Sequence, residues 1–228
     1  MQRKDVFVEG EFYHLYNRGN SKQPIFLDDQ DRDRFVKLLY LCNSERSIDF
    51  REDIVRQKID AFEWDRGDTI VSIAAWVLMP NHFHILVSEK ESVRKPGFRT
   101  NGISSYMHKL LTSYSKYFNK KYGRVGGLFE APFQGIRLDT DRYLKYMYSY
   151  IHLNPIKLID KNWKDGGTRY TKKFNKFLDN YVWSSYGDYM GIRRSYGNVL
   201  DTTAFPEYFK NPKIFKEEIF DWLTFGEQ

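Results

Sequence analysis

The segment TIVSIAAWVLMPNHFHILVS, residues Thr69–Ser88, decides how this chain folds. It contains two apolar runs rich in strand-forming residues, and the Pro80-Asn81 step between them is typical of a tight connection. The segment therefore predicts two adjacent antiparallel strands, Thr69–Pro80 and His82–Ser88.

The second of these strands places its side chains alternately on two faces of the sheet. We expect Phe83 and Ile85 on one face and His82 and His84 side by side on the other. Imidazole is the commonest metal ligand in proteins. This pair therefore offers a metal ion two adjacent coordination positions. The other interpretation is two ordinary exposed or hydrogen-bonded histidines. A closed zinc site is disfavoured, because Cys42 is the single cysteine and the other three histidines are scattered along the sequence.

Five further elements flank the hairpin. An aromatic, β-prone run predicts a first strand, and apolar residues at helical spacing predict a helix after it. A long helix, a fourth strand and a helix that ends before Pro155 follow the hairpin. In chain order the expected elements occupy residues 10–20, about 29–43, 69–80, 82–88, 103–123, 128–138 and 141–154. This βαββαβ series predicts an α+β, ferredoxin-like fold, with a four-stranded antiparallel sheet, helices on one face and an additional helix.

The rest of the chain forms additions to this core. We expect a core over residues 1–160, with a strongly charged insertion at about 44–68, and a C-terminal extension over 161–228 that packs on the core. No apolar run reaches 18 residues, which argues against a spanning helix and a membrane partner. The N-terminus lacks the apolar region of a signal peptide, and a single cysteine suits a reducing compartment, so a cytoplasmic location is expected.

The charge distribution favours a polyanionic partner. The net charge is +6, and the segment from Lys95 to Arg137 holds eight basic residues and one acidic residue. A positive surface attracts phosphate backbones, and the 17 tyrosines and 18 phenylalanines can stack on unpaired bases. The alternative interpretation is a solvated basic helix over an aromatic core.

The helix predicted from Asp141 carries a second unusual pattern. Tyr146, Tyr150 and Asn154 recur at four-residue intervals and therefore share one face. The stripe is either part of an aromatic core or a tyrosine nucleophile followed by an amide metal ligand. A tyrosine that attacks a phosphodiester conserves the bond energy in a phosphotyrosine, and a divalent cation can polarise the phosphate.

These segments resemble the single-tyrosine HUH transposases. AWVLMPNHFHILV is similar to the His-hydrophobic-His motif of that family. YLKYMYSYIHLNPIK resembles its tyrosine helix, which ends in Asn-Pro in the REP-associated tyrosine transposases. HLYNRGN, YFNKKYGRVGGLFEAPFQ and WSSYGDY also resemble this subgroup, so the resemblance extends from about His14 to Tyr189 in the expected order.

The resemblance implies cleavage and strand transfer of single-stranded DNA through a 5′-phosphotyrosine, on an RRM-related core that binds Mg²⁺ or Mn²⁺. By position, Tyr150 matches the nucleophile, and His82, His84 and Asn154 match the metal ligands. Some relatives have glutamine at the position of Asn154, and the shorter amide implies a looser hold on the metal.

Two other tyrosines compete with Tyr150 for the role of nucleophile. Tyr148 lies about 200° around the helix from Tyr150 and is expected to point away. Tyr146 shares the stripe but lies one turn further from Asn154.

Single-stranded or hairpin DNA is the expected partner, and a homodimer would suit exchange between two DNA ends. The cations expected to follow the DNA backbone are Arg18, Lys116, Lys120, Lys121, Arg124 and Arg137. Two other functions stay open. One is a non-catalytic module whose RRM-like sheet binds single-stranded nucleic acid by stacking, and the other is a metal-dependent phosphodiesterase that activates water.

Overall fold

A four-stranded antiparallel sheet forms the centre of the computed structural model, which describes residues 7–90, 102–130, 132–163 and 172–224. The strand order is β2-β3-β1-β4, and the pairs β2–β3, β3–β1 and β1–β4 are all antiparallel. The strands are β1 (Phe12–Arg18), β2 (Val71–Met79), β3 (His82–Glu89) and β4 (Gln134–Arg137). This order confirms the predicted α+β, ferredoxin-like fold.

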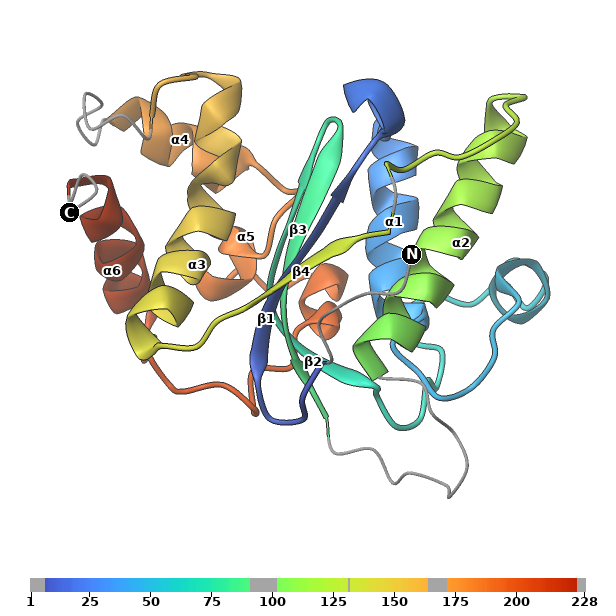
Figure 1. The fold of residues 1–228 in the computed structure, drawn as a ribbon, viewed down its shortest axis with the longest axis horizontal. Helices are drawn as coiled ribbons and strands as arrows, with labels where there is room; N and C mark the ends of the chain where they lie inside the picture. Colours follow the sequence, from blue (N-terminus) through green and yellow to red (C-terminus); the bar gives the residue numbers. More distant parts are fainter. Residues whose placement is uncertain (1–6, 91–101, 131, 164–171, 225–228) are drawn as a thin grey trace.

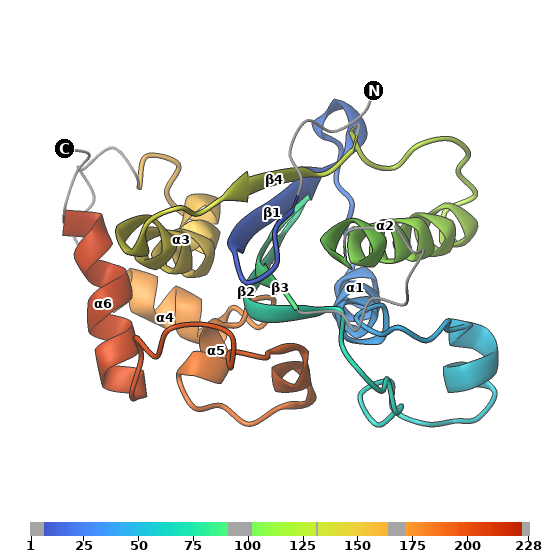
Figure 2. The same ribbon diagram turned by 60° about the horizontal axis from the view of Figure 1, so that its bottom comes forward.

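Helices cover both faces of the sheet. Figure 2 shows α1 (Asp29–Leu41) and α2 (Gly102–Lys121) on one face, and α3 (Asp141–Leu153) on the other. The C-terminal helices lie on the α3 side (Figure 1) and are α4 (Lys172–Asn180), α5 (Tyr186–Tyr189) and α6 (Pro212–Thr224). Short helical turns occur at Asn20–Lys22, Phe50–Val55, Asn154–Leu158 and Ser195–Val199. Within the described ranges, no helix is both long enough and apolar enough to span a membrane.

The ends of the main helices follow from local sequence. Asp28 and Asp31 form a reciprocal capping box at the start of α1, in which the Asp28 carboxylate accepts a hydrogen bond from the Asp31 N–H at 2.9 Å. The Thr140 hydroxyl caps α3 by accepting from the Tyr143 N–H at 3.2 Å. Gly123, just beyond α2, has φ of +61°, a conformation that side chains other than glycine rarely adopt.

The fourth strand is shorter than predicted. The sequence predicted it over residues 128–138, but β4 contains only Gln134–Arg137. Before it, Phe129 forms an isolated bridge with Gly19. Pro132 has no N–H to donate to a ladder, which explains why regular pairing begins only after it.

The charged insertion at 44–68 has a small apolar cluster of its own. Leu41, at the end of α1, packs there with Ile54 and Ala61. Lys109 of α2 donates to the Ser44 carbonyl at 2.6 Å, so the insertion is also tied to the main body.

Residues 181–201 run along the outer edge of β2. Four of its carbonyl groups accept hydrogen bonds from this segment: Tyr181 Oη–Leu78 O at 2.6 Å, Ser185 N–Trp76 O at 2.9 Å, Tyr189 Oη–Ala74 O at 2.8 Å and Asp201 N–Ile73 O at 2.9 Å. The division of the chain at residue 160 stays a prediction, but this part of the extension lies directly against the sheet.

Candidate active site

The register of the hairpin places the two histidines on the α3 face of the sheet. Phe83 and Ile85 belong to the apolar core shared with α1 and α2. His82 and His84 point the other way, with ring centroids 5.0 Å apart. The expected separation of the two faces of β3 is therefore confirmed.

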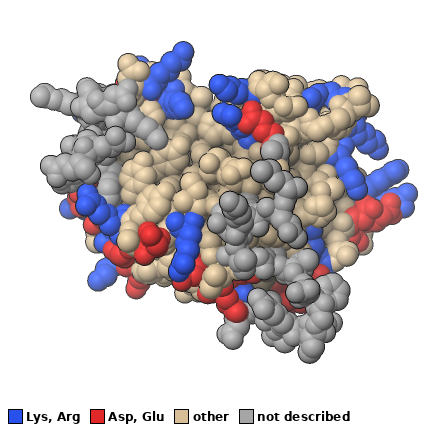
Figure 3. Space-filling view, viewed as in Figure 1, with Lys and Arg blue, Asp and Glu red and all other residues tan. Residues whose placement is uncertain are grey.

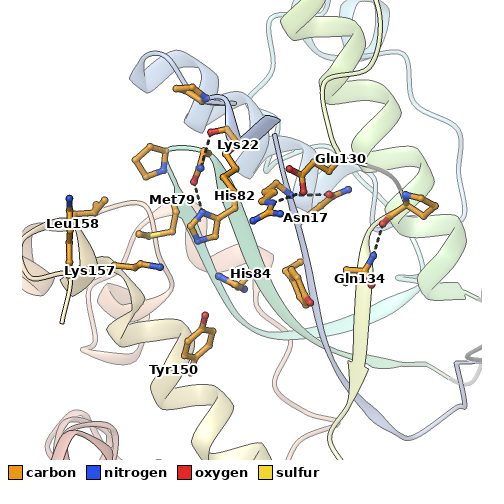
Figure 4. A pocket seen from close by; sticks show the side chains of 17 residues that line it. Asn17, Lys22, Met79, His82, His84, Glu130, Gln134, Tyr150, Lys157 and Leu158 are labelled. Carbon is orange, nitrogen blue, oxygen red and sulfur yellow. Dashed lines mark hydrogen bonds and ion pairs between the residues drawn. The ribbon is translucent and has the colours of Figure 1, made fainter. Parts of the chain in front are cut away.

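Helix α3 brings Tyr150 to this pair of histidines. The Tyr150 and His84 rings meet edge to face, with centroids 5.3 Å apart. Figure 4 shows the Tyr150 hydroxyl and both imidazoles facing one space between the helix and the sheet. Burial raises the pKa of Tyr150, and a hydrogen bond from the Asn154 side chain opposes this increase, because it stabilises the phenolate.

Asn154 lies at the end of α3, one turn after Tyr150. Pro155 follows it, and the chain continues as a short 3-10 turn. The Asn154 side chain is buried and interacts with both Tyr150 and His82. The predicted four-residue spacing thus brings Asn154 and Tyr150 together on the face of α3 that meets the histidines.

Hydrogen bonds fix the protonation of the His82 ring. Asn81 donates its Nδ2–H to the Lys22 carbonyl at 3.0 Å, so its Oδ1 accepts from His82 Nδ1–H at 2.7 Å. The His82 Nε2 therefore carries the lone pair. Burial lowers the pKa of His82 to about 4, and the nearby charge of Lys157 contributes to the decrease. The ring is neutral near pH 7, the form that binds metals.

His14 is a member of the site that the sequence did not reveal. Its Nε2 lies 2.8 Å from His84 Nδ1, and the two rings stack with centroids 5.0 Å apart. His14 is 70 residues away from His84 in the sequence, but the fold brings the two rings together. Strand β1 pairs with β3 so that Tyr16 is opposite His84, which makes His14 the diagonal neighbour of His84. The proximity of His14 to His84 follows from the register between β1 and β3, which cannot be read from the sequence.

A cavity of about 1060 Å³ opens in front of these rings. His82, His84 and Tyr150 line it, together with four cations: Arg18, Lys22, Lys157 and Lys161. Figure 3 shows Lys and Arg side chains on both sides of the opening between α3 and the sheet. Lys157 and Lys161 follow Asn154 by three and seven residues, a helical spacing that could have revealed them.

Of the six cations predicted to bind DNA, Arg18 lines this cavity and the other five lie elsewhere. Lys121 forms ion pairs with Asp28 at 2.7 Å and Asp31 at 2.8 Å. Arg137 forms an ion pair with Glu11 at 2.6 Å, and Arg124 donates a hydrogen bond to Gln23 at 3.1 Å. Lys116 and Lys120 are exposed on α2. Since α2 covers the sheet face opposite α3, Lys116, Lys120 and Lys121 are not brought to the histidines. Lys95 and Arg99 of the basic segment lie outside the described residues.

The other tyrosines of α3 are less well placed. Tyr148 is only 2% exposed and packs against Tyr189 and Phe209, which confirms that it points away from the histidines. Tyr146 stacks on Tyr150 with centroids 6.1 Å apart. Tyr150 is the member of this group that lines the cavity.

The donor set fits a divalent cation only if an amide is included. Among the described residues, no group of three His, Cys, Asp or Glu side chains is arranged to hold a metal. His82 and His84 supply two imidazoles, and the buried amide of Asn154, in contact with His82, supplies an oxygen. Amide oxygen suits Mg²⁺ and Mn²⁺, and imidazole is a common ligand of Mn²⁺-type transition metals. The residues present therefore fit the predicted cation.

The fold and the site define one arrangement, a ferredoxin-like sheet that carries a His-x-His pair opposite a tyrosine on a helix. No family model matches the chain, and no curated protein matches it. Among solved structures, it is similar to a REP-associated tyrosine transposase bound to a REP hairpin, with a TM-score of 0.50 and 14% sequence identity. The match covers 91% of this chain and 98% of that chain. At this identity the likeness shows a shared fold.

Proposed function

We propose that this protein is a metal-dependent DNA strand transferase of the single-tyrosine HUH type. It would cleave and rejoin single-stranded or hairpin DNA through a 5′-phosphotyrosine. The observation that carries the proposal is the convergence of Tyr150, His82 and His84, from two separate elements, on one cation-lined cavity, with the buried Asn154 side chain beside Tyr150. The shared fold with a transposase bound to a DNA hairpin gives further support.

In this proposal each side chain of the site has a distinct task. The Tyr150 oxygen forms a bond to phosphorus while the bond from phosphorus to O3′ breaks. The phenol loses its proton to solvent and O3′ takes one up, which leaves a 3′-hydroxyl and a 5′-phosphotyrosine. His82, His84 and Asn154 would hold the Mg²⁺ or Mn²⁺, whose positive charge would polarise the scissile phosphate. Attack of a 3′-hydroxyl on the phosphotyrosine reverses these bond changes and rejoins the strand.

The cations at the cavity would position the DNA backbone. Lys157 is exposed, is close enough to His82 to lower its pKa, and points into the cavity in Figure 4. We therefore assign it a phosphate next to the scissile bond. Arg18 is held by Glu130 at 2.5 Å and would contact the backbone on the sheet side. Contacts of this kind set affinity and salt dependence more than sequence preference.

The experiment that tests the function is covalent trapping. The protein is incubated with a labelled pool of single-stranded DNA hairpins and Mn²⁺, then denatured, and the labelled protein is measured on a gel. We expect a labelled band that is lost on chelation and in Tyr150→Phe. The matched control is Tyr146→Phe, which removes the neighbouring hydroxyl of the same stacked pair and should retain the band.

The alternatives predict different results in the same assay. A non-catalytic module would bind the hairpins tightly and give no band with either protein. A phosphodiesterase that activates water would cut the DNA without a covalent product, and Tyr150→Phe would still cut. Either result would overturn the proposal.

A further inference from the structure

We infer that His14 is a positioning residue that orients His84 and sets which of its ring nitrogens faces the cavity. The inference rests on the proposed function, because the consequence of this role is metal binding. His14 comes from β1 and His84 from β3, and the two strands pair along their whole length. Both side chains are buried, at 4% and 5% exposure. Strand pairing therefore holds the two rings at a fixed separation.

The contact between the rings is specific to one atom of each. His14 Nε2 and His84 Nδ1 are 2.8 Å apart, a normal hydrogen-bond length, and the ring planes differ by 26°. Tyr16 packs against both rings, with its centroid 5.1 Å from His14 and 5.8 Å from His84. The stacked group prevents either imidazole from turning away.

One proton lies between these two nitrogens, and its position decides the role of His84. If His84 donates from Nδ1, its Nε2 keeps the lone pair that a cation requires. If His14 donates instead, His84 Nε2 must carry the proton and cannot be a ligand. His14 is able to accept, and so it permits the form of His84 that binds metal. An acceptor behind the ring also makes the ligating nitrogen more basic.

The neighbouring histidine has an equivalent support. His82 donates from Nδ1 to Asn81, whose amide is anchored on Lys22, and this leaves Nε2 for a ligand. Both histidines of the pair thus have an acceptor at Nδ1, one an amide oxygen from the turn and the other the His14 imidazole. Each acceptor holds the proton of its histidine on Nδ1 and leaves the lone pair of Nε2 to bind a metal, which is the arrangement that a metal site requires.

The test is Mn²⁺ binding to the full chain without DNA, measured by calorimetry. We expect His14→Phe, which keeps a ring but removes the acceptor, to weaken Mn²⁺ binding about 10-fold to 100-fold. His14→Gln can place its Oε1 near the position of Nε2 and should recover binding to within about threefold of the parent. His14→Asn has the same amide but a shorter reach, so it is the matched control and should bind as weakly as His14→Phe. Equal affinity in all four proteins would overturn the role of His14.

A second measurement uses the parent protein alone, in case the variants do not fold. The ¹⁵N shifts of the imidazole nitrogens in the Mg²⁺-bound protein report the tautomer directly. We expect His84 to carry its proton on Nδ1, and a proton on Nε2 would overturn the inference. If the parent binds neither cation, the proposed metal site fails together with this inference. If it binds Mn²⁺ and His14→Phe binds equally well, only the inference fails.

Discussion

The two faces of the sheet are built from the same strands but carry different kinds of side chain. On the α1–α2 face, β1 and β3 contribute Leu15, Phe83 and Ile85, each fully buried in an apolar core. On the α3 face, the intervening residues include His14 and His84, which line or support a cavity. The alternation of β3 thus places a core residue and a candidate site residue one position apart, although the α3 face also holds an apolar cluster that includes Leu86 and Met147. Substitutions on the α1–α2 face should therefore mainly lower the free energy of unfolding, and substitutions on the α3 face should mainly reduce covalent adduct formation.

The largest expected effect is on the chemistry of the α3 face. Tyr150→Phe should reduce covalent adduct formation by about 10⁴-fold or more, because no nucleophilic oxygen is left. It should change the free energy of unfolding by less than about 1 kcal/mol, since the ring is retained. Gel trapping and urea unfolding measure the two quantities.

Tyr114→Phe is the matched control on the other face. The Tyr114 hydroxyl donates to the Ile25 carbonyl at 2.5 Å within the core. Its removal should cost about 1–3 kcal/mol of stability and leave adduct formation within about twofold. If Tyr114→Phe abolished the adduct while the protein stayed folded, the two faces would not be functionally separate.

The second effect concerns two consecutive residues of β3. Phe83→Ala should destabilise the fold by about 3–5 kcal/mol, because it opens a cavity in the fully packed core. His84→Ala should cost about 1–3 kcal/mol and should also abolish Mn²⁺-dependent adduct formation. Urea unfolding of both variants gives the comparison. A larger stability loss for His84→Ala would mean that the α3 face is the principal core.

The third effect is a pH dependence of stability on the α3 face. His152 is fully buried, donates from Nδ1 to the Tyr148 carbonyl and accepts at Nε2 from the Ser185 hydroxyl. Burial lowers its pKa to about 3. Below a pH of about 6.5, the unfolded chain binds a proton that the folded chain does not. Stability should therefore fall by up to about 1.4 kcal/mol per pH unit from about 6.5 downward and level off near 3.

Replacement of the imidazole isolates this contribution. His152→Gln should flatten the dependence of unfolding free energy on pH between about 6.5 and 4 relative to the parent. Ser185→Ala keeps the buried imidazole and serves as the control, since it should lower stability but retain the steep dependence. If His152→Gln were as acid-sensitive as the parent, other groups would be responsible.

The smallest effect compares exposed lysines on opposite sides of the sheet. Lys157→Ala, at the cavity, should weaken hairpin DNA binding about 3-fold to 10-fold and reduce the slope of log affinity against log salt by about 1. Lys116→Ala, on α2, removes the same charge and should change the affinity by less than about twofold. Fluorescence anisotropy at several salt concentrations provides both values. Equal losses would indicate that DNA also covers α2.

Local patterns were sufficient to predict most of the fold. The Pro80-Asn81 connection set the hairpin, and strand alternation separated His84 from Phe83. Helical periodicity placed Tyr150 and Asn154 on one face, because these relationships depend only on neighbours in the chain. Their convergence on the histidines also required the packing of α3 on the sheet, which the family resemblance implied and no local pattern displays.

Contacts between distant segments were not predictable in the same way. The pairing of His14 with His84 depends on the register between β1 and β3, and no residue in either strand encodes it alone. Lys121 counted toward a basic surface in the sequence, but Asp28 and Asp31 neutralise it in the fold. Charge composition therefore counted Lys121 as free positive surface, and it did not single out Lys22, which lines the cavity.

The segment along the outer edge of β2 has a consequence for self-association. β2 is the last strand of the sheet, its sequence VSIAAWVLM has no charged residue, and every position is buried. A bare edge of this kind would be a template for strand addition by another copy and for fibrillar aggregation. The hydrogen bonds from Tyr181, Ser185, Tyr189 and Asp201 occupy its outward carbonyl groups. The C-terminal part of the chain thus occupies the edge of the sheet that would otherwise be open to strand addition by another copy.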